Sequence, residues 1–150
     1  MFILPDPPNM PLHQLRQFHQ AQKNAIHAEL ALAGLGNVGH PMLLFILHSC
    51  LDQEEEGNYY SQRDLAQILR ISSAAVTSSL KSLEREGFVR RQRLTGDQRR
   101  NRMIMTEKGK AAVEGCLTCF QRVDERVLSG FTPEEKTQLT AYLTRMTENL

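Results

Sequence analysis

The sequence predicts a mainly α-helical fold with one small β-hairpin. Apolar residues recur at helical spacing in six segments of the 150-residue chain. Two short strand-like segments flank a polar, glycine-containing loop, which is typical of a hairpin. The composition, 41% hydrophobic and 23% charged, excludes a disordered chain, a collagen-like chain and a disulfide scaffold. We therefore expect residues 1–150 to form a single domain.

The start of the chain and its cysteine content indicate the compartment. Residues 1–11 are proline-rich and predict a flexible extended arm. This segment lacks the basic region and the long apolar region of a secretory signal. The longest uncharged apolar run, residues 42–51, is too short to span a bilayer. The chain has 3 cysteines, an odd number that argues against a disulfide framework. We expect a cytoplasmic protein without a membrane partner.

Two helices are predicted in the first third of the chain. The first covers about residues 12–33, where Leu15, Phe18, Ile26 and Leu30 fall near one stripe. The glycine-rich segment 34–39 ends it. Pro41 fits the first turn of a second helix that reaches about Leu51 and is apolar around nearly its whole circumference. Such a helix is expected to be buried, and the acidic segment 52–58 after it is expected to be a surface loop.

Two short helices follow, each with a recognisable start. Ser61 is a plausible N-cap with Asp64 three residues later. Ser72 is the N-cap of the next helix. The inner side of that helix would carry Val76, Leu80 and Leu83, and Gly87 would end it.

The hairpin and two further helices complete the chain. Strands are predicted at residues 88–93 and 102–106. Thr106 then caps a long helix, residues 107–128. The last helix, residues 133–150, starts with Thr132 as N-cap, a proline at the first position and a glutamate at the third.

Helix, tight turn, helix and hairpin, in this order, form a winged helix-turn-helix. The second helix of such a unit must enter a DNA major groove about 12 Å wide, so its exposed side cannot be uniformly bulky or acidic. Here that side is small and hydroxylated at its N-terminal end. The backbone amides at Ser72 and Ser73 are placed where a phosphate could sit. The side chains that could reach base edges or phosphates are Ser73, Thr77, Ser78 and Lys81.

The charge distribution supports an anionic partner. The net charge is +1, but residues 81–110 hold ten Lys and Arg against four Asp and Glu, a net +6. Within the hairpin loop, Arg99 and Arg100 suit the negative potential of a minor groove. Asp97 is expected to orient Arg99 by a charge-assisted hydrogen bond.

In these segments the chain resembles the MarR-type (multiple antibiotic resistance regulator) transcription factors. The resemblance runs from about residue 43 to residue 109 and is carried by an ordered set of motifs rather than by any one of them. These motifs are SQRDLA (61–66), ISSAAVT (71–77), LKSLEREGFVRR (80–91), DQR (97–99) and MTEKG (105–109). The sequence departs from the family pattern at Ser78, where the family often has a long basic or amide residue. The shorter side chain leaves the operator sequence open.

The resemblance implies a homodimer that binds a pseudo-palindromic double-stranded DNA operator. The dimerisation helices would lie at about residues 12–33 and 107–150. The DNA-binding region would cover about residues 40–106. The function implied is a ligand-responsive transcriptional repressor that is not an enzyme and uses no cofactor, metal or catalytic residue. The predicted DNA-binding residues are Ser61, Ser72, Ser73, Ala74, Ala75, Thr77, Ser78, Lys81, Arg90, Asp97, Arg99 and Arg100. The candidates for binding a small-molecule effector are His13, Phe18 and His40.

Other functions are weighed against this one. A metal-sensing regulator of the same fold would need clustered ligands, but no two of the 5 histidines lie four residues apart on a predicted helix. A redox sensor could use Cys116 and Cys119, although small buried residues at a dimer seam explain them better. An enzyme would need a catalytic motif, and none occurs. A protein-interaction module without DNA binding is disfavoured by the six arginines between Arg90 and Arg102.

Overall fold

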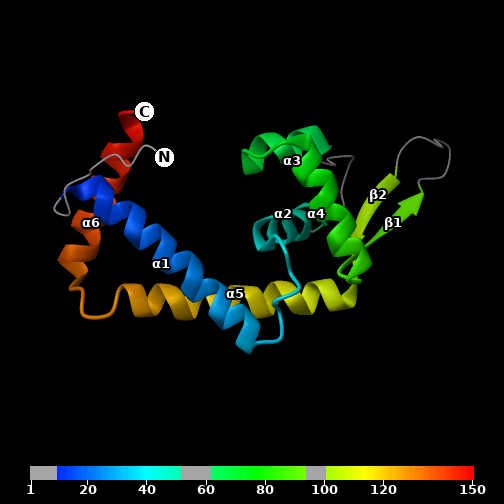
Figure 1. Cartoon of the computed structure of the whole chain (residues 1–150), viewed down its shortest axis with the longest axis horizontal. Coiled ribbons are helices and arrows are strands. Elements are labelled where there is room, and N and C mark those ends of the chain that lie inside the picture. The colour runs from blue at the N-terminus through cyan, green and yellow to red at the C-terminus, as the bar shows by residue number, and fades with distance from the viewer. Residues whose placement is uncertain (1–9, 52–61, 94–100) are drawn as a thin grey trace, which may run out of the picture. The chain divides into compact units, whose positions relative to one another are not determined.

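The computed structural model describes residues 10–51, 62–93 and 101–150, and confirms a mainly helical chain with a two-stranded antiparallel wing (Figure 1). The helices are α1 (Pro11–Leu32), α2 (Pro41–Leu51), α3 (Gln62–Leu69), α4 (Ser73–Arg85), α5 (Glu107–Val127) and α6 (Pro133–Glu148). The strands are β1 (Val89–Arg93) and β2 (Asn101–Met105). The chain divides into two compact units, residues 1–26 with 120–150 and residues 27–119.

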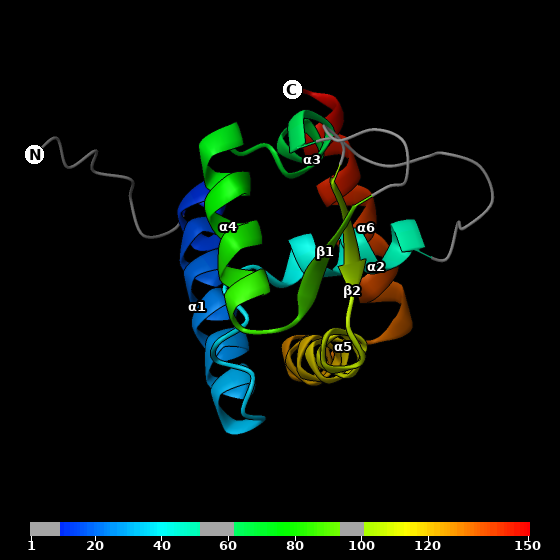
Figure 2. The same cartoon turned by 90° about the vertical axis from the view of Figure 1, so that its right-hand side faces the viewer.

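The second unit, residues 27–119, contains the winged helix-turn-helix. α3 packs on α4, and α4 packs along β1 (Figure 2). β1 and β2 pair in antiparallel register from Val89 opposite Met105 to Arg93 opposite Asn101. Each strand begins one residue away from its predicted start. The core of this unit is built from apolar side chains of every element, among them Leu43, Leu44, Leu65, Val76, Leu80, Leu83, Phe88, Val89, Met105 and Val113.

Helix ends in the structure follow local sequence signals. Ser72 accepts a hydrogen bond from the Ala75 amide at 3.1 Å, which confirms it as the N-cap of α4. Gly87 ends α4 with φ of +80°, a left-handed conformation that favours glycine. Thr132 and Glu135 form the predicted capping box, in which each side chain accepts from the other residue's backbone amide.

The expectation that α2 is buried all round is wrong. Leu43 and Leu44 are fully buried, but Met42 is 49% exposed and the following apolar residues are only partly covered. The reason lies in the packing, because α2 packs against β2 and α3 while the side that carries Met42 stays half exposed.

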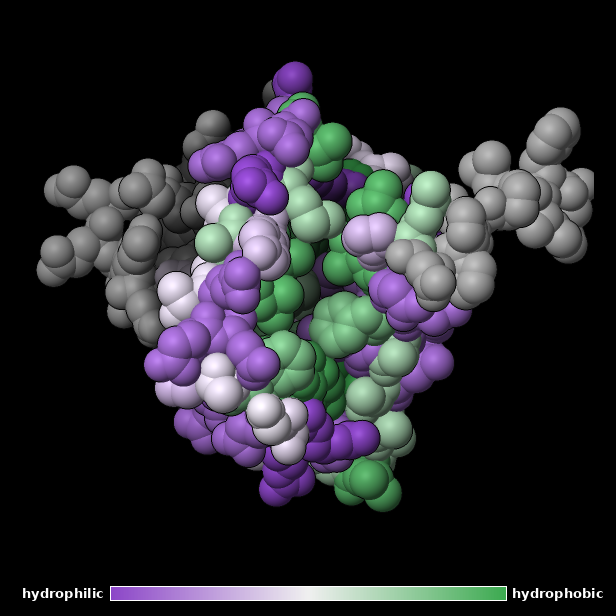
Figure 3. All heavy atoms as spheres, turned by 90° about the vertical axis from the view of Figure 1, so that its left-hand side faces the viewer, coloured by the Kyte–Doolittle hydropathy of each residue, from purple (hydrophilic) through white to green (hydrophobic). Residues whose placement is uncertain are grey.

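The first unit, residues 1–26 and 120–150, leaves much apolar surface uncovered. No residue of α6 is buried. Figure 3 views the molecule from the side of α6 and shows hydrophobic residues exposed among hydrophilic ones. Within this unit, the large apolar residues exposed in α1 and α6 are Leu12, Leu15, Phe18, Leu139, Tyr142 and Leu143, which we call the open apolar face. A face of this kind is typical of an interface rather than of a monomer surface.

None of the helices in the described parts of the chain has the length and apolar character to cross a bilayer.

Candidate nucleic-acid interface

The recognition helix α4 has a buried and an exposed side. Val76, Leu80 and Leu83 are at most 2% exposed and anchor the inner side. The outer side presents Ser73, Ala74, Ser78 and Lys81, all exposed. The helix therefore offers small side chains and the Lys81 cation to a partner, and Arg85, one turn further along, is exposed as well.

The N-terminal end of α4 has its polar groups organised by Ser72. The Ser72 hydroxyl accepts a hydrogen bond from the Ala75 amide, so this amide is not available to a ligand. The amides of Ser73 and Ala74 precede the helical hydrogen-bond ladder, where backbone donors lack intrahelical acceptors. An anion at this end would meet those donors and the positive end of the helix dipole.

Thr77 is more constrained than the sequence indicated. Its hydroxyl lies 2.9 Å from Gln62 Oε1 and 3.0 Å from the Ser73 carbonyl oxygen, and it donates toward both. The side chain is half-buried between α3 and α4. Gln62 was not among the predicted site residues. Its position as an exposed polar residue at the start of α3 was the available signal.

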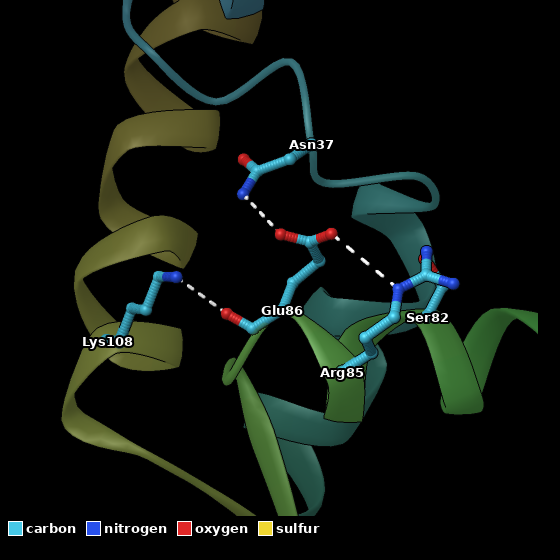
Figure 4. A network of polar contacts seen from close by, with 5 residues as sticks. All are labelled: Asn37, Ser82, Arg85, Glu86 and Lys108. Atoms are coloured by element: carbon cyan, nitrogen blue, oxygen red, sulfur yellow. Dashed lines mark hydrogen bonds and ion pairs between the residues drawn. The ribbon is translucent and has the colours of Figure 1, made fainter.

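The C-terminal end of α4 is held by a polar network around its C-cap, Glu86 (Figure 4). Lys108 Nζ of α5 donates to the Glu86 carbonyl oxygen at 2.6 Å. Asn37 Nδ2, in the loop between α1 and α2, donates to Glu86 Oε2 at 3.1 Å. Arg85 Nε lies 3.8 Å from Glu86 Oε1. The network ties the point where the recognition helix ends and the wing begins to two other elements. Neither Asn37 nor Lys108 is among the predicted site residues, because Glu86, which both contact, lies far from them in the sequence.

The base of the wing contributes positive charge. Arg90 is exposed, whereas Arg91 forms an ion pair in which its Nε lies 3.1 Å from Glu84 Oε2. Lys108 Nζ also lies 4.9 Å from the centre of the Phe88 ring, a cation–π contact. Arg90 in β1 and Lys81 in α4 therefore both carry exposed positive charge. Four further predicted site residues, Ser61, Asp97, Arg99 and Arg100, lie outside the described residues.

The three effector candidates have local roles. His13 Nε2 lies 2.8 Å from Gln17 Nε2 one turn along α1, and Phe18 is 40% exposed. His40 Nδ1 accepts the Leu43 amide at 3.2 Å and so caps the start of α2. His13 and Phe18 belong to the first unit and His40 to the second. None of these contacts indicates a ligand, and the effector site stays a prediction.

The histidines and cysteines are the candidates for a metal or redox sensor. Within the described ranges, no three His, Cys, Asp or Glu side chains are close enough together to hold a metal ion. Cys116 and Cys119 are free and buried. Burial, and secondarily the neighbouring Cys119, raises the pKa of the Cys116 thiol to about 11. A thiol in this state stays protonated at neutral pH and is a poor nucleophile.

The chain is similar in sequence to known regulators. A family-level sequence model, that of the MarR family, matches residues 44–100. The chain is 36% identical over 90 residues to the uncharacterized HTH-type transcriptional regulator YdgJ of Bacillus subtilis, which covers 60% of this chain and 55% of that protein. It is 32% identical over 90 residues to the HTH-type transcriptional regulator PecS of Dickeya dadantii, with 60% of this chain and 54% of PecS covered. The chain thus spans about half the length of these curated relatives.

The fold is also found in solved structures. A crystal structure of the S. aureus MepR–DNA complex superimposes with a TM-score of 0.73 at 22% sequence identity, covering 93% of this chain and 96% of that one. At this level of identity the likeness establishes the fold. It extends over the helices on both sides of the helix-turn-helix, whereas the sequence matches are confined to a shorter stretch.

Proposed function

The chain belongs to the MarR family of HTH-type transcriptional regulators, and we propose on this basis that it is a ligand-responsive repressor that binds a pseudo-palindromic operator as a homodimer. The relatives are regulators and not enzymes, so no catalytic activity is proposed. The proposed site of action is the cytoplasm.

One observation above all supports DNA binding. The outer side of α4 carries small and hydroxylated residues, and an exposed Arg90 lies at the base of the adjacent wing. α4 would enter the major groove, while the wing arginines would approach the neighbouring minor groove. Most of the affinity would come from Lys and Arg contacts to phosphate, and specificity from α4 and from DNA shape. The solved relative MepR is described in complex with DNA.

The open apolar face supports the homodimer. Leu12, Leu15 and Phe18 of α1 and Leu139, Tyr142 and Leu143 of α6 are each between 36% and 54% exposed in the single chain. A second copy would cover them and bring two recognition helices to one duplex. Half-sites on B-DNA repeat at about 34–36 Å, so the dimer must hold its helices at that spacing to dock both.

Regulation would act through this spacing. A small molecule shifts the dimer between DNA-binding and non-binding arrangements only if it binds them with unequal affinity. His13, Phe18 and His40 remain the candidate contacts for this effector.

The alternative sensing mechanisms have less support. A redox sensor would need a reactive thiolate, but the buried Cys116 thiol has a raised pKa of about 11. A metal sensor would need a cluster of ligands, and the described residues contain none. The remaining alternative is a winged-helix module that binds protein instead of DNA. The salt dependence of DNA binding distinguishes it from the proposed function.

The salt dependence of binding to mixed genomic DNA tests the proposed function. We expect binding that weakens with salt, with a log–log slope of about −0.9 for each phosphate neutralised. The slope can be measured by fluorescence anisotropy across a salt series. Absence of binding at low salt, or a slope near zero, would instead support a protein-interaction module.

Arg99 at the wing should contribute strongly to that affinity. We expect Arg99→Ala to weaken DNA binding by about tenfold or more and to make the salt slope less steep by about one phosphate per subunit. Oligomeric state and melting temperature should stay unchanged. Gln98→Ala, which removes no charge from the same loop, is the matched control. If Arg99→Ala bound DNA with wild-type affinity, the wing would not contribute to DNA binding as proposed.

A further inference from the structure

A side-chain pair joins the two helices of the helix-turn-helix at the outer surface. Thr77 of α4 donates to Gln62 Oε1 of α3 at 2.9 Å. We propose that Gln62 donates a hydrogen bond to a DNA phosphate oxygen and that Thr77 holds its carboxamide in position, so that the two residues act as one contact. This inference rests on the proposed function.

The geometry fixes which end of the carboxamide is available. Its oxygen faces the Thr77 hydroxyl, which also lies 3.0 Å from the Ser73 carbonyl oxygen within its own helix. The carboxamide nitrogen, with two hydrogens, makes no further hydrogen bond among the described residues. Gln62 is exposed, so this nitrogen can meet a partner at the surface. A donor without an acceptor suits an anionic oxygen.

The position of Gln62 in the fold points to the DNA backbone rather than to a base. It is the first residue of α3, the first helix of the helix-turn-helix, which crosses the backbone when the second helix lies in the major groove. Glutamine side chains and helix N-termini are common phosphate contacts. The bond to Thr77 would then fix the register of α4 relative to that phosphate.

A purely structural role for the pair is the competing explanation, and the packing argues against it. α3 and α4 are already held together by Leu65, Val76 and Leu80, each at most 2% exposed. The turn between them is closed by a backbone hydrogen bond from Ile71 to Ala66 at 3.1 Å. An exposed hydrogen bond between neutral groups adds little to such a core, because water competes for both groups.

Four single variants and one double variant test the pair. Gln62→Met removes the carboxamide at similar length, and Gln62→Glu keeps an acceptor for Thr77 but presents a carboxylate to the phosphate. Thr77→Val removes the hydroxyl at constant shape, and Thr77→Ser retains it. The double variant combines Gln62→Met with Thr77→Val. Gln67→Met, at another exposed glutamine of α3, is the matched control. The probes are a duplex selected by the wild-type protein from a randomised library and mixed genomic DNA.

The expected results distinguish a phosphate contact from a structural one. Gln62→Met should bind both probes about tenfold more weakly, as expected for a lost hydrogen bond to a charged group. Its salt slope should equal that of the wild type, because a neutral donor releases no counterion. Gln62→Glu should bind more weakly still, whereas Thr77→Ser and Gln67→Met should bind normally. The double variant should lose no more affinity than whichever of its two single variants binds DNA more weakly. Such non-additive losses indicate that Gln62 and Thr77 form one shared contact. Melting temperatures should stay within the wild-type range.

Four results would overturn the proposal. Normal binding by Gln62→Met would show that the carboxamide is not a DNA contact. Losses that multiply in the double variant would show that the two residues act separately. A Thr77→Val variant that changes sequence preference while Gln62→Met stays silent would assign Thr77 to direct base contact. A wild-type protein that binds neither probe would overturn the proposed function itself, and this inference with it.

Discussion

Gly109→Ala is expected to destabilise the protein by about 3 kcal/mol, at the upper end of the range for overpacking. Gly109 lies in the first turn of α5, where a Cβ atom would collide with the Phe88 carbonyl oxygen and come within 2.6 Å of Met105 Sδ. The carbonyl cannot move away freely, because it accepts hydrogen bonds from both the amide and the hydroxyl of Thr106 at 3.1 Å. The collision therefore opens the junction between α5 and the wing. A total stability of about 5–15 kcal/mol makes this a large fraction of the whole.

Chemical denaturation followed by circular dichroism measures this loss. Gly36→Ala is the matched control, because a Cβ atom there would meet only Ala31 Cα at 3.8 Å, an ordinary contact. The control should change stability by no more than about 0.5 kcal/mol. Equal stability of Gly109→Ala and the wild type would mean that α5 does not approach Phe88 and Met105 as closely as the structure has it.

Leu143→Glu is expected to convert the proposed dimer into monomers and to weaken binding to the selected duplex by about 10²–10⁴-fold. Leu143 is 43% exposed in the single chain and belongs to the open apolar face. In a dimer the new carboxylate would be removed from water without a cationic partner, which is strongly unfavourable. A monomer carries only one recognition helix and loses the advantage of binding two half-sites at once.

Sedimentation measurements give the oligomeric state, and anisotropy with the selected duplex gives the affinity. Thr144→Glu places the same charge one residue later, where the threonine hydroxyl bonds to the Thr140 carbonyl oxygen at 2.9 Å. This control should remain dimeric, because one residue turns an α-helix by about 100°, which places Thr144 off the stripe formed by Leu139, Tyr142 and Leu143. A dimeric Leu143→Glu protein would exclude α6 from the interface.

Helix starts were predicted well because the signals that produce them are local. The caps at Ser72 and Thr132 depend on a side chain and an amide three residues apart, a distance that the sequence displays directly. The inner side of α4 followed in the same way from the spacing of Val76, Leu80 and Leu83. The predicted strands agree with the observed bounds to within one residue. The remaining difference arises because the ends of a strand depend on its pairing with the other strand.

Contacts between distant segments could not be predicted. Asn37 meets Glu86 across 49 residues of sequence, and Gln62 meets Thr77 across 15. No periodicity encodes such pairs, because each depends on how two helices pack. The misjudged burial of α2 has the same origin. The composition of that helix shows that it is apolar, but only its neighbours decide which side is covered.

The sequence by itself determined the order of the elements, the helix boundaries, the basic segment and the family resemblance, all of which depend on residues close together in the chain. The tertiary structure decided which polar side chains meet at the ends of α4, why Gly109 must lack a side chain, and which apolar residues remain at the surface. These features depend on distances between segments that only folding brings together, where a difference of one ångström separates a contact from a collision.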